Sequence, residues 1–186
     1  MAIRELKLNV GCGTTKIKGY INIDRAKICK PNLLLDITRE HLPYKVGTVD
    51  EILFFHSIEH IRKWYHKVVL LEFSRVLKDG GRLYVSYPNL WECVRRWHTN
   101  ANGQRQFWEA TIYGRQLYPG DYHVAAISSD ELTNTLYECG FTDVTSNPES
   151  DEPFNTITAA TKKGPPIPSY ETVVARDIQS MVVKGA

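Results

Sequence analysis

The sequence predicts a single α/β domain with a mostly parallel β-sheet covered by helices. Short apolar or β-rich runs alternate with segments of helical periodicity, which is the pattern of such a sheet and its crossover helices. The chain has 186 residues, of which 42% are hydrophobic and 24% charged. This length and ordinary composition suit one globular domain with a substantial core.

Seven runs are expected to form the strands. Each is short and rich in aliphatic, aromatic or β-branched residues. In chain order they span residues 6–10, 20–23, 33–35, 51–55, 82–86, 142–146 and 155–161.

Two segments carry a helical pattern. The first spans residues 64–77, where apolar side chains recur at helical spacing, and Asp79-Gly80-Gly81 is expected to supply its left-handed stop. The second begins at Ser128-Ser129-Asp130-Glu131, which is typical of a capping box, and ends at Gly140. Its inward face is expected to hold Leu132, Leu136 and Cys139.

The first strand runs directly into Gly11-Cys12-Gly13, a Gly-x-Gly turn. Glycines suit such a turn because the backbone bends sharply and a ligand can approach where no Cβ stands. The next two strands are each followed by an acid, Asp24 and Asp36. Asp24 can accept both hydroxyls of a ribose, and Asp36 can accept an adenine amino proton while Ile37 covers the ring. These strand ends predict an adenosine site at the carboxyl edge of the sheet.

A plainer role is open for the same residues. Asp24 and Asp36 could each cap a strand end or a turn. Cys12, between the two glycines, is expected to be a small neighbour of the ligand and not a nucleophile.

Over residues 6–162 the chain resembles the class I S-adenosylmethionine-dependent methyltransferases. Besides the strand ends, the resemblance rests on residues 49–60, on residues 77–88, and on residues 132–144 with Cys139-Gly140-Phe141. It implies a Rossmann-like sandwich whose seven-stranded sheet has the order 3-2-1-4-5-7-6, with the seventh strand antiparallel. It also implies S-adenosylmethionine as cofactor and S-adenosylhomocysteine as product. The residues expected to bind the cofactor are Asn9, Gly11, Cys12, Gly13, Asp24, Asp36, Ile37 and His56.

The chain departs from the family's pattern near the first turn. Asn9 stands where the family often has an acid, and Thr15 where it often has a third glycine. Residues 13–19 leave room for about one helical turn, so the first crossover helix is expected to be truncated or missing. This argues against a nicotinamide dehydrogenase, because a dinucleotide pyrophosphate binds at the N-terminus of that helix.

Two histidines are candidate catalytic bases. Methyl transfer needs an acceptor held in line with the methyl group, and a hydroxyl or protonated amine acceptor also needs a base. His56 follows the fourth strand and His123 precedes the capping box at Ser128, although a local hydrogen-bonding role is equally open for each. His56 and His60 are four residues apart, but no third ligand follows at a convincing spacing, so no metal site is expected.

Residues 87–123 are expected to form an insertion or lid over the carboxyl edge of the sheet. They hold Trp91, Trp97 and Trp108 with interleaved arginines. Aromatic faces suit sugars and guanidinium groups suit acids, so the expected acceptor is an oxygen or nitrogen of a small molecule or glycan. The plainer alternative is a mini-core with solvated arginines.

A nucleic-acid acceptor is less favoured. Enzymes that methylate exocyclic base amines commonly carry an Asn/Asp-Pro-Pro-aromatic motif after the fourth strand, where this chain has Phe55-His56-Ser57-Ile58. Two other functions stay open: a catalytically silent cofactor-binding partner subunit, and an RNA- or protein-directed methyltransferase that uses the insertion's arginines.

The remaining expectations concern the setting of the protein. The net charge of +2 gives no strong nucleic-acid or membrane surface, and the four scattered cysteines favour reduced thiols. The apolar residues 6–10 are too few for a signal peptide or a membrane span. We expect a cytoplasmic monomer or homodimer with a methyltransferase domain at residues 1–163 and a linker and tail at 164–186.

Overall fold

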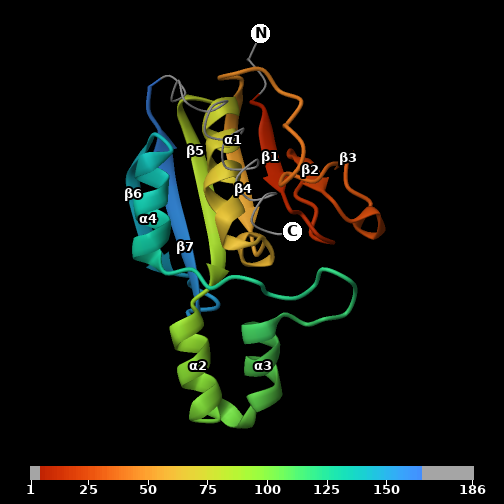
Figure 1. The fold of residues 1–186 in the computed structure, drawn as a ribbon, viewed down its shortest axis with the longest axis vertical. Helices are drawn as coiled ribbons and strands as arrows, with labels where there is room; N and C mark the ends of the chain where they lie inside the picture. Colours follow the sequence, from red (N-terminus) through yellow and green to blue (C-terminus); the bar gives the residue numbers. More distant parts are fainter. Residues whose placement is uncertain (1–4, 165–186) are drawn as a thin grey trace, which may run out of the picture.

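A computed structural model of the protein describes residues 5–164, arranged around one sheet (Figure 1). The sheet has seven strands in the order β3-β2-β1-β4-β5-β7-β6. Strand β7 runs antiparallel to β5 and β6, and the other neighbours are parallel. The predicted strand order and the antiparallel seventh strand are confirmed. Beyond Gly164, the expected tail lies outside the described residues.

Every predicted strand is found, with ends shifted by up to five residues. The strands are β1 (Lys7–Val10), β2 (Ile21–Asp24), β3 (Leu33–Leu34), β4 (Val49–Phe55), β5 (Leu77–Pro88), β6 (Phe141–Pro148) and β7 (Asn155–Lys162). The helices are α1 (His66–Val76), α2 (Leu90–His98), α3 (Arg105–Tyr113) and α4 (Ser129–Glu138). Single 3-10 turns lie at Lys27–Cys29, Ile58–His60, Lys63–Tyr65 and Ala101–Gly103.

The end of helix α1 differs from the prediction. The expected glycine stop is wrong, because the helix ends at Val76 and Leu77 already has extended dihedrals (φ −67°, ψ 139°). Leu77 pairs with Val49 of β4, so strand pairing ends this helix. Gly80 does have a positive φ of 77°, but this residue lies within β5 and not at the end of the helix.

Helix α4 begins as the sequence predicts. The Ser128 side chain accepts a hydrogen bond from the Glu131 backbone N–H at 3.2 Å, which caps the first turn. The inward residues Leu132, Leu136 and Cys139 are buried, as expected.

Helices α1 and α4 cover the same face of the sheet (Figure 1). Because side chains alternate along a strand, Ile52 and Phe54 of β4 point to this face. The Phe54 ring meets Phe73 of α1 edge-on, with 5.1 Å between ring centroids. The core of the domain therefore lies between α1, α4 and this face.

The opposite face carries polar side chains instead of a helix. Glu51 of β4 is buried there and contacts Tyr20, Lys7 (3.9 Å) and Arg82 (2.8 Å). Residues 11–20 form no helix, which confirms the predicted loss of the first crossover helix. The expectation of a helix-covered sheet thus holds for one face of the described chain.

Two expectations about the setting can be compared with the structure. Cys12, Cys29, Cys93 and Cys139 are all free and buried. None of the helices within residues 5–164 combines the length and the apolar character that a membrane crossing requires.

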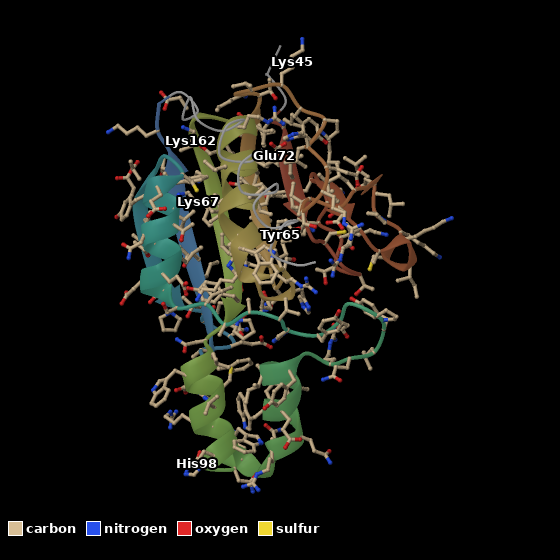
Figure 2. All side chains as sticks on the ribbon, in the orientation of Figure 1. Lys45, Tyr65, Lys67, Glu72, His98 and Lys162 are labelled. Carbon is tan, nitrogen blue, oxygen red and sulfur yellow. The ribbon has the colours of Figure 1, made fainter. Side chains whose placement is uncertain are left out.

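A buried ion pair anchors the loop between β3 and β4 to helix α1. Glu72, labelled in Figure 2, is 2% exposed and accepts hydrogen bonds from the Leu42 backbone N–H (2.7 Å) and from Arg75 (2.6 and 2.8 Å). His41 Nδ1 lies 3.0 Å from the same carboxylate. Arg75 also donates to the carbonyls of Leu42 and Tyr44, both at 2.9 Å.

Replacing this carboxylate is expected to destabilise the domain strongly. Glu72→Ala leaves the Arg75 guanidinium without its buried counter-charge, which costs about 3 kcal/mol or more. For a chain of this size the expected loss in Tm is about 6–12 °C, measured by circular dichroism. The control is Glu138→Ala, which removes an exposed partner of Lys67 (2.8 Å) and should change stability by less than about 1 kcal/mol. Equal Tm values for the two variants would contradict the anchoring role.

Candidate functional site

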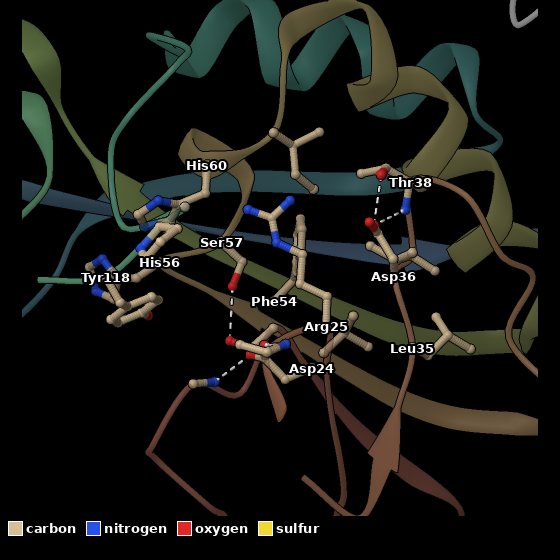
Figure 3. A pocket seen from close by; sticks show the side chains of 18 residues that line it. Asp24, Arg25, Leu35, Asp36, Thr38, Phe54, His56, Ser57, His60 and Tyr118 are labelled. Atoms are coloured by element: carbon tan, nitrogen blue, oxygen red, sulfur yellow. Dashed lines mark hydrogen bonds between the residues drawn. The ribbon is translucent and has the colours of Figure 1, made fainter. Parts of the chain in front are cut away.

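A pocket opens at the carboxyl ends of β1, β2 and β4 and beside the chain that follows β3 (Figure 3). Its lining includes most of the residues that the sequence predicts: Gly11, Gly13, Asp24, Asp36, Ile37 and His56. In Figure 3, Asp36 and Thr38 lie at one end, and His56, His60 and Tyr118 lie at the other. Asp24 lies between the two ends. The pocket is therefore elongated, with an acid end and a histidine end.

A glycine is needed at position 11 because of the adjacent Ser57 side chain, whether or not a ligand is bound. It has a φ of +66°, and a Cβ built on it would stand 2.1 Å from Ser57 Oγ. Ser57 Oγ donates to the Gly11 carbonyl at 3.0 Å, which joins the turn after β1 to the turn after β4. Gly13 also has a positive φ (+51°), but a Cβ there would meet no atom within 4 Å. Gly13 is thus the glycine that leaves open space beside the pocket.

Asp24 holds the end of β2 against the glycine turn. Its Oδ2 accepts from the Gly13 N–H and its Oδ1 from the Ala26 N–H, both at 2.7 Å. The capping role that the sequence left open is therefore present. Each carboxylate oxygen has a second lone pair, so capping leaves acceptor capacity at the pocket.

Asp36 also makes a local turn. Its Oδ1 accepts from the Thr38 N–H (3.0 Å) and the Thr38 hydroxyl (2.6 Å). Its Oδ2 lies 3.8 Å from Arg39 Nε. Strand β3 ends at Leu34, so Asp36 and Ile37 stand in the loop just beyond the strand. Both residues line the pocket.

Two expected ligand contacts lie beneath the pocket and not in its lining. Asn9 is buried, and its Nδ2 donates to the Thr15 carbonyl (3.0 Å) and to Asn22 Oδ1 (2.9 Å). Cys12 is also buried, and burial raises the pKa of its thiol to about 11. The Asn9 side chain therefore supports the turn after β1, and contact of Asn9 and Cys12 with the ligand stays a prediction.

His56 stands in the pocket in a left-handed backbone conformation, with φ +46°. A positive φ is uncommon outside glycine, and such strained positions cluster at functional sites. The His56 ring is 46% exposed, and its Nδ1 lies 3.6 Å from Glu59 Oε1. Burial lowers the pKa of His56, and the carboxylates of Glu59, Glu149 and Glu152 more than offset this, so the pKa stands above its usual value.

His123 is placed differently from His56. It is absent from the pocket lining and its ring packs edge-on against His60, with 4.8 Å between centroids. Burial lowers the pKa of His123. His60 does line the pocket, so the His60 ring stands between His123 and the pocket.

The buried part of the aromatic insertion packs on itself, whereas Trp91, Tyr113 and Tyr122 are exposed. Helices α2 and α3 form a hairpin beyond the carboxyl edge of the sheet (Figure 1), and Trp108 is 2% exposed against Phe107 and Phe154. Arg96 lies over the Trp108 ring and pairs with Glu92. Within residues 87–123, the pocket is lined only by Tyr118, Pro119 and Gly120. The mini-core alternative thus describes the hairpin, and the segment after α3 reaches the site.

Sequence reasoning missed several lining residues. Arg25 and Ser57 each follow a predicted site residue directly, so their place beside a strand end is a usable signal. Tyr118 comes from a distant loop and carries no such signal. Its place depends on how the chain after α3 folds back.

Comparison with known proteins agrees with this architecture. Residues 8–85 match the family model described as a methyltransferase domain. These residues hold β1 to β4 and most of β5, including the glycine turn and both acids. Over its first five strands the chain is therefore similar to a methyltransferase domain.

A curated relative matches part of the chain's length. A probable S-adenosylmethionine-dependent methyltransferase of Mycobacterium tuberculosis is 31% identical over 104 residues, which are 55% of this chain and 30% of that protein. The chain thus matches less than a third of that relative.

Solved structures share the fold over most of the chain. A methyltransferase from Archaeoglobus fulgidus has a TM-score of 0.63 at 15% identity, covering 85% of this chain and 86% of the other. A phosphoethanolamine N-methyltransferase of Haemonchus contortus, solved with S-adenosylmethionine, has a TM-score of 0.57 at 12% identity, covering 88% and 50%.

The contact between Gly11 and Ser57 predicts an unequal response of the two glycines. Gly11→Ala combines a left-handed alanine with a steric clash and should lower the free energy of unfolding by about 2–4 kcal/mol. Gly13→Ala meets open space and should cost about 1–2 kcal/mol. Both values are measured by chemical denaturation.

A double mutant separates the clash from the backbone strain. Adding Ser57→Gly to Gly11→Ala removes the clashing side chain, so the two changes should be less than additive in a double-mutant cycle. Strict additivity would show that Ser57 does not constrain Gly11.

Proposed function

We propose that this protein transfers the methyl group of S-adenosylmethionine to an oxygen or nitrogen of a small-molecule or glycan-like acceptor. The observation that carries the proposal is the elongated pocket, which has Asp36 at one end, Asp24 between the ends and histidines at the other end. This order suits a cofactor with adenine near Asp36, ribose near Asp24 and the methyl group toward His56.

The residues of the acid end fit the adenosyl group. Gly13 leaves room for the cofactor beside the turn, and Asp24 retains lone pairs for the ribose hydroxyls. Asp36 is partly exposed and can accept the adenine amino proton. Leu35 and Ile37 supply apolar surface for the ring on the same side of the pocket.

His56 is the proposed base at the methyl end. Bound S-adenosylmethionine supplies an activated methyl group on sulfur, so the protein has to orient the acceptor and take its proton. The neutral His56 ring can accept that proton, a contribution of about 10²–10⁴-fold in rate. His123 stays a prediction as a second catalytic residue, and its place behind His60 suits a positioning role.

Tyr118 and Arg25 in the pocket lining favour a small, ring-containing acceptor with an acidic group. Tyr118 lies at the histidine end, and Gly120 lies so close to Arg25 that a Cβ on it would stand 3.1 Å from Arg25 Nη2. An aromatic face suits a sugar or a planar ring, and a guanidinium group suits a carboxylate or phosphate. The net charge of +2 gives little general attraction for nucleic acid.

The proposed reaction is tested by measuring S-adenosylhomocysteine formation with a panel of acceptors, beside calorimetric titration of the cofactor. Turnover with sugar or small acidic acceptors supports the proposal. Cofactor binding without turnover of any acceptor would instead favour the partner-subunit function. RNA binding that falls steeply with salt would favour an RNA-directed enzyme.

The ribose contact predicts a binding loss. Asp24→Ala should weaken S-adenosylmethionine binding by more than about tenfold, or 1.4 kcal/mol, in calorimetry. Asp24→Asn keeps one oxygen for a backbone N–H and should lose less affinity. Asp151→Ala, at an exposed position, is the control. If Asp24→Ala remains folded and binds like the wild type, the ribose does not lie at Asp24.

The base role predicts a loss in rate without a loss in cofactor affinity. His56→Asn should lower kcat by about 10²-fold or more, because asparagine tolerates the left-handed backbone but cannot act as the base. Cofactor affinity should change by less than about threefold. A variant with wild-type kcat would exclude His56 as the base.

A further inference from the structure

Glu59 is a buried carboxylate that accepts no hydrogen bond from any residue within 5–164. It lies in the turn after β4 and is 3% exposed, and both Oε1 and Oε2 lack a hydrogen-bond partner in this part of the chain. Its nearest ion-pair contact, His56 Nδ1, is 3.6 Å away. A buried carboxylate without compensation is costly, so this group calls for a positively charged partner.

Two histidines converge on this carboxylate. One ligand atom from each of Glu59, His60 and His123 lies within 4.8 Å of the other two. The Glu59 carbonyl accepts from the backbone N–H groups of Val124 (2.9 Å) and Ala125 (3.2 Å), which holds the His123 segment against the turn after β4. The cluster is therefore fixed by the backbone on both sides.

The His60 ring is already oriented by a backbone group. His60 Nδ1 lies 3.0 Å from the Tyr122 carbonyl, and the His123 ring packs edge-on against His60, with 4.8 Å between ring centroids. A ring nitrogen that donates to a carbonyl leaves the other nitrogen with a free lone pair. This is the usual arrangement of histidines that bind metals.

We propose that Glu59, His60 and His123 bind a divalent first-row transition metal, with zinc as the first choice. Two imidazoles and one carboxylate are a ligand set that suits this class of ion and leaves coordination positions open. Ligand atoms around such an ion stand about 3–3.5 Å apart, so small rotations of the three side chains close the site. The ion supplies the charge that the Glu59 carboxylate lacks.

No metal site was expected from the sequence, and the proposed site differs from that expectation. The sequence shows no third ligand at a regular spacing from His56 and His60, but folding brings His123 to His60. His60 also lines the pocket, so an ion held there has an open position facing the proposed acceptor end. Metal binding can be measured alone and does not depend on the proposed reaction.

A second group of residues is a weaker candidate and provides the control. His56, Glu149 and Glu152 also bring ligand atoms within 4.8 Å of one another. Their carboxylates already accept hydrogen bonds from Ser86 and Asn155. These carboxylates are therefore compensated, unlike that of Glu59.

The test is titration of the chelator-treated full-length protein with Zn²⁺ by calorimetry and with Co²⁺ by visible absorption. We expect one equivalent of each ion to bind, with ligand-field bands of histidine-ligated cobalt. Glu59→Gln and His123→Gln should each weaken binding by about 100-fold or more. Glu149→Gln and His98→Gln, the latter at the hairpin tip in Figure 2, should bind like the wild type.

Thermal unfolding separates lost binding from lost folding. Zn²⁺ should raise the Tm of the wild type. Glu59→Gln should remain folded without metal, which its own Tm shows, and should abolish the increase with Zn²⁺. Absence of binding by the wild type, or binding that depends on Glu149 and not on Glu59, would overturn the proposal. S-adenosylmethionine titrated into the metal-free protein tests the proposed function separately.

Discussion

The site depends on one constraint, the close approach of the turn after β1 to its neighbours on both sides. Ser57 from the β4 side bonds to Gly11, and Asp24 from the β2 side bonds to Gly13. No helix lies between β1 and β2, so no helix N-terminus supports the turn after β1. Asn9 therefore completes the support from beneath, through the Thr15 carbonyl. Side-chain hydrogen bonds therefore support the floor of the pocket. A protein with a first crossover helix could use the N-terminus of that helix at this position.

The features predicted from the sequence are those that local pattern determines. Strand β4 is predictable because its run of apolar residues is continuous, and β1 because it meets a glycine turn. Asp24 and Asp36 are predictable because carboxyl ends of parallel strands meet at one edge. The strand order could be stated from the resemblance alone, since no property of any single strand determines its neighbour.

The features that were missed depend on contacts between distant residues. Helix α1 ends where Leu77 pairs with Val49, and that pairing overrides the glycine signal three residues later. His123 reaches Glu59 and His60 through a loop whose sequence has no regular period. The aromatic residues of α2 and α3 were ambiguous because rings that pack on each other and rings that contact a ligand have the same composition. Only burial, as at Trp108, distinguishes the two uses.

The position of the tryptophans has an optical consequence. Trp91, Trp97 and Trp108 lie on the α2–α3 hairpin, and the fourth, Trp64, lies in the 3-10 turn before α1. Intrinsic fluorescence therefore reports mainly on the hairpin, whereas far-ultraviolet dichroism reports on the whole sheet. The two signals observe different parts of one molecule. Coincident melting curves would show that hairpin and sheet unfold as a single cooperative unit, and separated curves would identify the hairpin as a subdomain with its own stability.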